Sequence, residues 1–437
     1  MVLTASRFRT VQKLAICLVL ALTAQAARAA SGFIPQRRMG YTAGDQWEPA
    51  LTADGRGHIY ILFPQYGPVP GCAACTVPTM ALITSNDNGV SWEPARPLLV
   101  SATGQFDASI KVDPVDHQTL YASWLQDNNR DIIVARSQDF GRSWYFAVAE
   151  RSPEDAIVDK PVLAVRGPNI YVAFNHDQTL SVAASHDNAQ NFSSTVVNPD
   201  APPGWSLAAG ATVDLNGNVF FSWMAYARRN IFTQPVDIYI SKSADGGRTW
   251  NTTTMDVSSA APGCPAQACS VGFLASQIAL ASDDAGTIYA LWNAGSSTGA
   301  AERIYFASSS NAGENWTAKT DVSSAKPAVE HCFPAITAGS AGDVRIAWMD
   351  TRRKDAQDHP LWNTFYRAST NGGATWSPES QLSDPVRGYD YIQPNGFLFP
   401  FGNFFSIAID NQGTTHAVWG EGRNYKSPGS IWYTHGR

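Results

Sequence analysis

Short apolar stretches alternate with turn-forming residues along nearly the whole chain. The segments 58–64 (HIYILFP), 218–224 (NVFFSWM) and 287–292 (TIYALW) are rich in β-branched and aromatic residues and are only six or seven residues long. Runs of this length and composition, bounded by Gly, Asp, Asn and Pro, are typical of β-strands. The pattern predicts an all-β chain built from many short strands.

These strands recur in groups, and six groups share an eight-residue motif of the form S-x-D-x-G-x-x-W. In each group three strands lead into the motif and a fourth follows it. Spacings of 48 to 66 residues separate successive copies, as expected for a repeat architecture. Four strands in a meander describe one blade of a β-propeller. The motifs start at Ser85, Ser137, Ser185, Ser243, Ser309 and Ser369.

The number of blades differs from the number of motifs. After the sixth motif the chain still contains three strand-like segments, at 405–410, 415–421 and 431–437. We predict that residues 32–37, near the N-terminus, supply the missing outer strand of that last blade, because this pairing closes the ring and hides the strand edges. The predicted fold is therefore a seven-bladed propeller with six motifs. Six blades with an irregular C-terminal cap is the alternative.

The repeated motif has the composition of a braced turn. Its Ser and Asp or Asn side chains can bond backbone amides, its Gly suits a positive φ, and its Trp can pack between neighbouring sheets. Six copies at equivalent places cannot together form one active site. We interpret the motif as structural and not as a source of catalytic acids.

The N-terminal segment has the features of a secretory signal peptide. Three basic residues precede the apolar run at 14–22, and small residues suited to cleavage follow at 24–26 and 27–29. We predict a signal peptide over 1–29, with a retained anchor as the alternative, and one propeller domain over 30–437. The expected location is secreted or periplasmic. The net charge of −6 argues against a nucleic-acid partner, no second apolar run approaches spanning length, and we expect a monomer.

The repeated motif resembles the Asp-box of the bacterial neuraminidase repeat (BNR) proteins, the sialidase-like β-propeller superfamily. The resemblance extends over essentially the whole chain after residue 30 through the six motifs. It implies a propeller whose ligands bind on the face opposite the motifs, formed by loops between second and third strands and by connections between blades. The superfamily includes sialidases, other glycoside hydrolases, polysaccharide lyases and proteins without known catalysis, so fold alone does not assign the activity.

The resemblance also implies candidate site residues on that opposite face. By position, Asp350 would be the catalytic acid, and Tyr391 with Glu421 would form the nucleophilic pair. Arginine offers a planar fork to a substrate carboxylate. The implied substrate-binding residues are Arg352, Arg423, Arg228 and Arg130. The aligned starts of the inner strands place Glu48, Asp107, Lys160 and Gln277 around the axial opening.

The chain departs from the sialidase pattern in two ways. No arginine precedes Ile34-Pro35, where sialidases carry Arg-Ile-Pro or Arg-Leu-Pro, and we count seven blades instead of six. The predicted function is therefore broad: cleavage of an acidic saccharide, by an exo-α-sialidase-like glycoside hydrolase or by a polysaccharide lyase. A non-catalytic propeller that binds glycan or protein is the first alternative.

Five cysteines remain after the predicted signal peptide. In an oxidising compartment the short spacings predict disulfides Cys72–Cys75 and Cys264–Cys269. Cys332 is then left over beside His331, and a metal-binding protein that uses these two residues with nearby cysteines is the second functional alternative. Thr76 follows Cys75, which excludes a haem attachment there. We expect no cofactor, with a metal ion left open.

Overall fold

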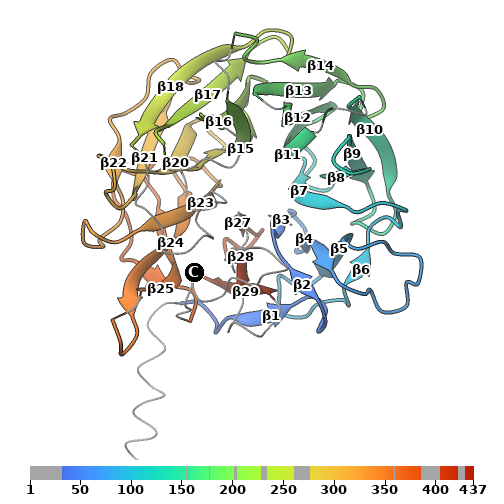
Figure 1. The fold of residues 1–437 in the computed structure, drawn as a ribbon, viewed down its shortest axis with the longest axis horizontal. Helices are drawn as coiled ribbons and strands as arrows, with labels where there is room; N and C mark the ends of the chain where they lie inside the picture. The colour runs from blue at the N-terminus through green and yellow to red at the C-terminus, as the bar shows by residue number, and fades with distance from the viewer. Residues whose placement is uncertain are drawn as a thin grey trace, which may run out of the picture.

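A computed structural model provides the structure of the protein. The described residues form seven antiparallel sheets around a central axis, which confirms the seven-bladed propeller (Figure 1). Six of the sheets have four strands and one has five. The structure describes residues 32–153, 156, 158–176, 178–200, 204–227, 234–259, 276–358, 360–384, 404–421 and 429–437.

The first four blades follow the chain in order. Blade 1 has β3 (Ala50–Ala53), β4 (Ile59–Tyr66), β5 (Thr79–Ser85) and β6 (Arg96–Pro97), with β2 (Asp45–Gln46) also pairing with β4. Blade 2 has β7 (Phe106–Val112), β8 (Leu120–Gln126), β9 (Asp131–Ser137) and β10 (Tyr145–Arg151). Blade 3 has β11 (Val158–Arg166), β12 (Asn169–His176), β13 (Thr179–Ser185) and β14 (Ser193–Val196). Blade 4 has β15 (Trp205–Val213), β16 (Val219–Tyr226), β17 (Val236–Ser243) and β18 (Asn251–Ser258).

The last three blades complete the circle. Blade 5 has β19 (Ile278–Ser282), β20 (Ile288–Ala294), β21 (Arg303–Ser309) and β22 (Thr320–Asp321). Blade 6 has β23 (His331–Ala338), β24 (Val344–Lys354), β25 (Pro360–Ser369) and β26 (Ser380–Gln381). Blade 7 has β27 (Phe405–Ile409), β28 (Thr415–Glu421) and β29 (Ser430–Gly436), and its outer strand is β1 (Arg37–Met39).

Blade 7 joins the two ends of the chain, as the sequence predicted. Arg37 pairs with Tyr433 in the β1–β29 ladder, and an isolated bridge links Phe33 to Gly436. The pairing extends to Met39, two residues beyond the predicted segment. Because β1 occupies the outer edge of β29, the ring is closed and the six-bladed alternative is wrong.

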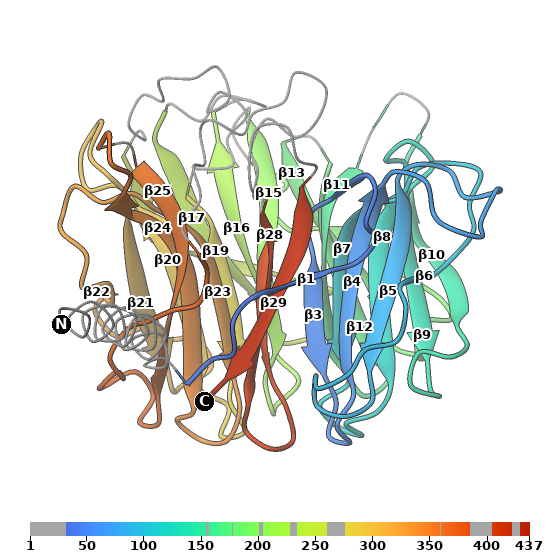
Figure 2. The ribbon, with the colours of Figure 1, turned by 90° about the horizontal axis from the view of Figure 1, so that it is seen from below.

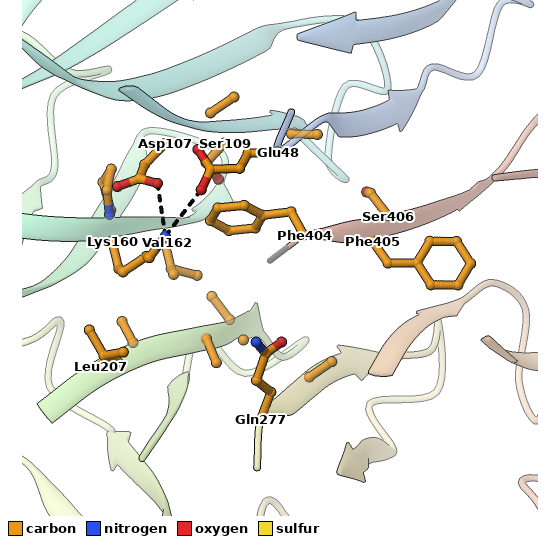
Figure 3. Close-up of a pocket in the computed structure, with 18 of the residues that line it drawn as sticks. Glu48, Asp107, Ser109, Lys160, Val162, Leu207, Gln277, Phe404, Phe405 and Ser406 are labelled. Atoms are coloured by element: carbon orange, nitrogen blue, oxygen red, sulfur yellow. Dashed lines mark hydrogen bonds and ion pairs between the residues drawn. The ribbon is translucent and has the colours of Figure 1, made fainter. Parts of the chain in front are cut away.

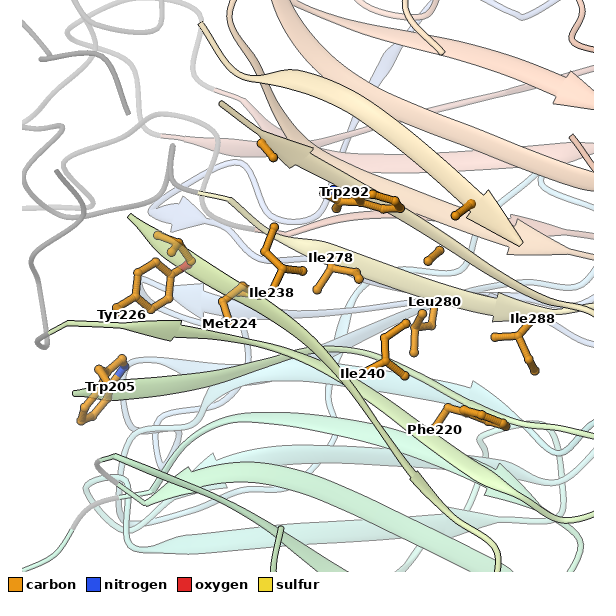
Figure 4. Packing of buried hydrophobic residues seen from close by; sticks show 14 residues of the cluster. Trp205, Phe220, Met224, Tyr226, Ile238, Ile240, Ile278, Leu280, Ile288 and Trp292 are labelled. Atoms are coloured by element: carbon orange, nitrogen blue, oxygen red, sulfur yellow. The ribbon is translucent and has the colours of Figure 1, made fainter. Parts of the chain in front are cut away.

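Apolar side chains fill the spaces between neighbouring blades. Between blades 4 and 5, for example, Phe220 and Ile238 pack with Ile278 and Trp292 (Figure 4). The second strands contribute large side chains that are almost fully buried, such as Trp124 in blade 2. A blade is thus hydrophobic on both faces, and the ring lets each face pack against a neighbour.

The repeated motif braces the turn between the third and fourth strands. In the first copy the Ser85 hydroxyl donates to Asp87 Oδ1 at 2.8 Å and accepts from the Gly89 amide at 2.9 Å. Asp87 Oδ1 also accepts from the Ser91 amide at 2.8 Å, and Gly89 has a φ of 82°. The same contacts recur in the other copies, which supports the structural interpretation of the motif.

The tryptophan of the motif packs between neighbouring sheets, as predicted, but is only partly buried. Trp144 packs against the cluster between blades 1 and 2, and its indole donates to the Gly141 carbonyl at 3.0 Å. We expect Trp144→Ala to lower the free energy of unfolding by about 2 kcal/mol, because only part of the ring leaves water on folding. Trp124→Ala, at a fully buried indole, should cost about 3–5 kcal/mol. Urea unfolding of both variants tests this order, and equal losses would contradict it.

The two ends of the propeller differ in what they expose. The motif turns lie at one end of the strands (Figure 2). At the other end, which we call the upper face, the first strand of each blade begins and the second strand ends. The predicted site residues that the structure describes, among them Arg130, Asp350, Arg352 and Glu421, belong to segments on this upper face.

Candidate functional site

A cavity of about 390 Å³ lies on the propeller axis. The first strands of all seven blades line it: β3, β7, β11, β15, β19, β23 and β27. Many lining residues have small side chains, among them Ala50, Ala108, Ala209, Gly210 and Ala279. Small side chains on the innermost strands leave the centre of the ring open.

Three polar residues at the upper end of this cavity share an unusual backbone conformation. Glu48, Asp107 and Lys160 stand at the starts of the inner strands of blades 1, 2 and 3, with φ values of 53°, 53° and 51°. The strand register shifts at Asp107 and at Lys160, which marks β-bulges. A left-handed conformation costs roughly 1–2 kcal/mol for such residues. Strain repeated at the rim of a cavity is typical of a functional site.

The three side chains meet at one ammonium group. Lys160 Nζ lies 2.9 Å from Asp107 Oδ1 and 3.5 Å from Glu48 Oε1 (Figure 3). The two carboxyl side chains are only 7% and 3% exposed, and the lysine side chain is 15% exposed. The ring of Phe404 lies 4.7 Å from the same ammonium. The group is therefore a largely desolvated charge cluster.

Burial raises the pKa values of two acids in this cluster toward neutral pH. Burial raises the pKa of Glu48 to about 8, although Lys160 opposes the shift. Burial, helped by the charge of Asp107, raises the pKa of Asp159 to about 7, and the Asp159 carboxyl shares a hydrogen bond with that of Asp107. Burial lowers the pKa of Lys160, but the surrounding carboxylates outweigh it and the net shift is upward.

A phenol completes the group. Tyr66, at the end of β4, lines the cavity, and burial together with the nearby carboxylates raises its pKa well above the usual value. The site thus combines protonated carboxyl groups, an ion pair and a neutral phenol. General acid–base catalysis uses two carboxyl groups in different protonation states, one as the acid and one as the base.

The sequence located part of this cluster. Glu48, Asp107, Lys160 and Gln277 were predicted around the axial opening, and all four line the cavity. Asp159 and Tyr66 were missed. Both flank strand ends on the upper face, but nothing in their spacing indicates that burial would shift their pKa values.

Asp350 and Arg352, predicted as acid and clamp, lie together in blade 6. Arg352 Nε and Nη2 donate to the two oxygens of Asp350 at 2.9 and 2.6 Å, and Nη1 pairs with Glu379. Its guanidinium carbon lies 3.8 Å from the centre of the Phe365 ring. Asp350 is fully buried. In this arrangement the arginine fork is occupied by the protein's own carboxylates.

Glu421 occupies the matching position in blade 7. It is 2% exposed and accepts a hydrogen bond from the Trp419 indole at 2.8 Å. Asp350 accepts from the Trp348 indole in the same way at 2.9 Å. In both blades the indole of a tryptophan thus donates to a carboxylate two residues later at the end of the second strand. This second repeated contact was not predicted from the sequence.

The remaining predicted residues are not brought together among the described residues. Arg130 pairs with Asp127 at 2.6 Å. Tyr391, Arg423 and Arg228 lie outside the described residues. The predicted nucleophilic pair and the predicted arginine clamp therefore stay predictions.

His331 is held by hydrogen bonds on both ring nitrogens. Nδ1 donates to the carbonyls of Glu302 and Val329 at 2.9 and 2.8 Å, and Nε2 accepts from the Ser323 hydroxyl at 2.7 Å. Burial lowers the pKa of His331 to about 4, so the ring is neutral. Cys332 is a buried free thiol. No group of three or more His, Cys, Asp or Glu within the described ranges is arranged to hold a metal ion.

Glu302 forms a second buried acid away from the axis. It is 1% exposed, and the hydroxyl of Ser276 donates to it at 3.0 Å. Burial raises the pKa of Glu302 to about 8, and the same cause raises that of Glu330, whose carboxylate accepts from the Glu302 amide at 3.2 Å. These acids lie where blades 5 and 6 meet and do not line the axial cavity.

One predicted disulfide is present. Cys72 and Cys75 are bonded, with their Cα atoms 5.4 Å apart. The second predicted pair, Cys264–Cys269, lies outside the described residues. In the part of the chain that the structure describes, no helix is long and apolar enough to cross a membrane.

Comparison with known proteins finds solved structures with a similar fold. No family model matches the chain, and no curated protein matches it. A protein of unknown function from Dyadobacter fermentans matches with 12% identity and a TM-score of 0.52, over 92% of this chain and 98% of its own. A polysaccharide lyase, an ulvan lyase, matches with 13% identity and a TM-score of 0.50, over 90% and 95%.

A third solved structure is an intramolecular trans-sialidase from Ruminococcus gnavus. Its match has 11% identity and a TM-score of 0.47, over 92% of this chain and 97% of its own. Identities this low indicate a shared fold and do not assign an activity. At the level of the fold, the chain is similar to the Dyadobacter fermentans protein and to the ulvan lyase.

Proposed function

We propose that the protein is an exported enzyme that cleaves a glycosidic bond of a saccharide bound at the upper end of the axial cavity. One observation carries the proposal: Glu48 and Asp159 hold protons near neutral pH beside the ion pair of Asp107 with Lys160. Perturbed acids gathered in a cleft are the usual mark of a catalytic site. The fold, shared with a polysaccharide lyase, supports a saccharide as the ligand.

Asp159 is the best candidate for the proton donor. It is more exposed than Glu48, and its pKa of about 7 lies near the expected working pH. A donor with a matched pKa can protonate the leaving oxygen of a glycosidic bond. Asp107, which pairs with Lys160 at 2.9 Å, is then the candidate base. Hydrolysis needs this base to activate water, whereas lyase cleavage needs it to remove a carbon-bound proton.

We propose an acidic saccharide as the substrate class. Lys160 and Lys111 are the cations that line the cavity within the described ranges. The arginine clamp predicted from the resemblance stays a separate proposal. Arg352 would have to exchange Asp350 and Glu379 for a substrate carboxylate before it could take part.

Export is proposed from the N-terminal sequence. The Cys72–Cys75 disulfide supports it, because such bonds persist mainly in oxidising compartments. The predicted signal segment itself lies outside the described residues.

The purified protein should be screened against sialosides, uronate-containing polysaccharides and neutral glycans, with detection of both reducing ends and unsaturated products. We expect cleavage by the parent and a loss of about a hundredfold in kcat for Asp159→Asn, because the amide cannot donate the acid's proton. Asp256→Asn, at a carboxylate on the outer strand β18, is the control and should keep full activity. Binding without cleavage by the parent would favour the non-catalytic alternative.

A further inference from the structure

The axial cavity contains a second lysine, and no described residue balances its charge. Lys111 stands near the far end of β7 and lines the same cavity as Lys160. Lys160 contacts two carboxylates, but no described residue forms an ion pair or hydrogen bond with the Lys111 ammonium. The two lysines therefore differ in one respect: only one of them has its counter-charge built into the fold.

The position of Lys111 explains where its side chain points. β7 is an innermost strand, with β3 and β11 of the adjacent blades packed against it on either side. The side chain of Lys111 is exposed, whereas Ile110 beside it is buried in the cluster between blades 1 and 2. A solvent-accessible side chain on an innermost strand extends into the axial space. The cavity walls around it still remove part of its hydration, and this desolvation lowers the pKa of Lys111.

An ammonium that extends into a cavity, with no described carboxylate beside it, leaves a positive charge there. Surrounding protein replaces part of its hydration, and nothing in the described residues compensates. Such a charge is favourable only when an anion comes close to it, and the attraction is stronger there than in bulk water because the effective dielectric constant is lower. The same site would reject a cationic ligand.

From this imbalance we propose that Lys111 binds an anionic substituent, a carboxylate or a sulfate ester, of the saccharide in the axial cavity. The proposal rests on the proposed function only in taking the ligand to be a saccharide. Lys111 lies four residues along β7 from Asp107, which is about 13 Å at the usual rise of a strand. The anionic group is therefore on a different sugar unit from the one at the acid cluster.

The intervening wall supports an extended ligand. Between the two positions the cavity is lined by Ala50, Ala108 and Ser109 of blades 1 and 2 and by Ala209 and Gly210 of blade 4. These small side chains leave room along the axis without adding charge. A chain of sugars can thus contact the acid cluster at one end and Lys111 at the other.

The test compares Lys111→Met with Lys242→Met. Lys242 carries the same charge but lies on β17, does not line the axial cavity, and pairs with Glu314 at 2.9 Å. The probes are tetrasaccharides of uronic acid, of sulfated sugar and of neutral sugar, and binding is measured by calorimetry at low salt. We expect the parent to bind an anionic probe, and Lys111→Met to weaken that binding about 10- to 100-fold, the range for a hydrogen bond to a charged group. Lys242→Met should bind as the parent does, and the neutral probe should be unaffected by either change.

The two anionic probes separate the sources of the negative group. Stronger binding of the uronic-acid probe assigns a carboxylate, and stronger binding of the sulfated probe assigns a sulfate. Lys111→Met should also melt no lower than the parent, because the ammonium has no partner among the described residues to lose. The proposal is overturned if the parent binds neither anionic probe, or if Lys111→Met binds them as tightly as the parent. Absence of cleavage would count against the proposed function alone, because these binding measurements do not depend on turnover.

Discussion

Deletion of residues 32–39 is expected to abolish cooperative folding at physiological temperature. The deletion removes β1, and with it the ladder that joins Arg37, Arg38 and Met39 to β29. It also removes the bond that the Thr434 hydroxyl donates to the Ile34 carbonyl at 2.5 Å. The edge of β29 would then be open, and an unprotected edge invites pairing with other chains. We expect a loss of more than about 5 kcal/mol, comparable to the whole stability of many domains.

The reason for so large an effect is that β1 connects two blades. The Arg37 guanidinium lies 5.1 Å from the ring centre of Tyr433 in blade 7 and 5.8 Å from that of Trp92 in blade 1, and it donates to the Gly89 carbonyl. Met39 is 8% exposed and packs in the cluster between the same two blades. Losing β1 therefore weakens the junction that closes the ring.

Two point variants separate this closure from a general effect of the N-terminus. Arg37→Ala should lower the melting temperature clearly, because its guanidinium bridges blades 7 and 1. Arg38→Ala should lower it less, because the hydrogen bonds from Arg38 Nη2 to the Tyr41 and Thr42 carbonyls are exposed and local in sequence. Thermal unfolding of both variants and of the deletion is the measurement. A deletion protein that melts like the parent would contradict the role of β1 in closure.

The sequence predicted the fold well because the fold is repeated. Each copy of the motif starting at Ser85, Ser137 or Ser243 indicates the same turn. A strand that is hard to assign in one blade can therefore be assigned by comparison with the other blades. The seventh blade was recognisable from the three strands after residue 404 that lack a motif. The weakest copy shows why patterns need a physical reason: Ala189 takes the Gly place with a φ of 64° and still donates its amide to Ser185 at 3.1 Å.

The site was harder to predict because its chemistry depends on burial and on distant partners. Glu48, Asp107 and Lys160 could be placed at the axis by aligning inner strands, but their mutual distances come from the closure of the ring. Arg352 looked available in sequence, yet Glu379, 27 residues later, shares its guanidinium with Asp350. Local spacing carries no information about such contacts.

The stability of the protein is expected to fall as the pH rises from 5 to 9. Burial raises the pKa of Glu48 and of Glu302 to about 8, and that of Asp159 to about 7. A carboxyl with a raised pKa in the folded state binds its proton more tightly there than in the unfolded chain. Its contribution is therefore complete below the unfolded pKa, near 4, and is lost as the pH rises through the folded value.

The size of the effect follows from the shifts. One pKa unit corresponds to about 1.4 kcal/mol, so a buried glutamate shifted from its usual value to about 8 can cost on the order of 5 kcal/mol above that pH. Acids of the repeated motif have lowered pKa values, so they make stability fall as the pH decreases. Hydrogen bonds from Ser143 lower the pKa of Asp139 to about 2, so its contribution is lost only as the pH falls toward that value. The two groups of acids together predict a maximum of stability near pH 5.

Glu302→Gln is the variant that isolates this effect from the axial cavity. The amide can keep hydrogen bonds with its neighbours but has no proton to lose, so the variant should lose less stability than the parent between pH 5 and 9. At pH 9 it should be the more stable of the two. Urea unfolding at pH 5, 7 and 9 measures both proteins, and Asp256→Asn serves as the control because its carboxylate pairs with the Lys319 ammonium at 2.6 Å. If the parent is equally stable at pH 5 and pH 9, the buried acids are not protonated at neutral pH, and the assignment of Asp159 as proton donor fails with them.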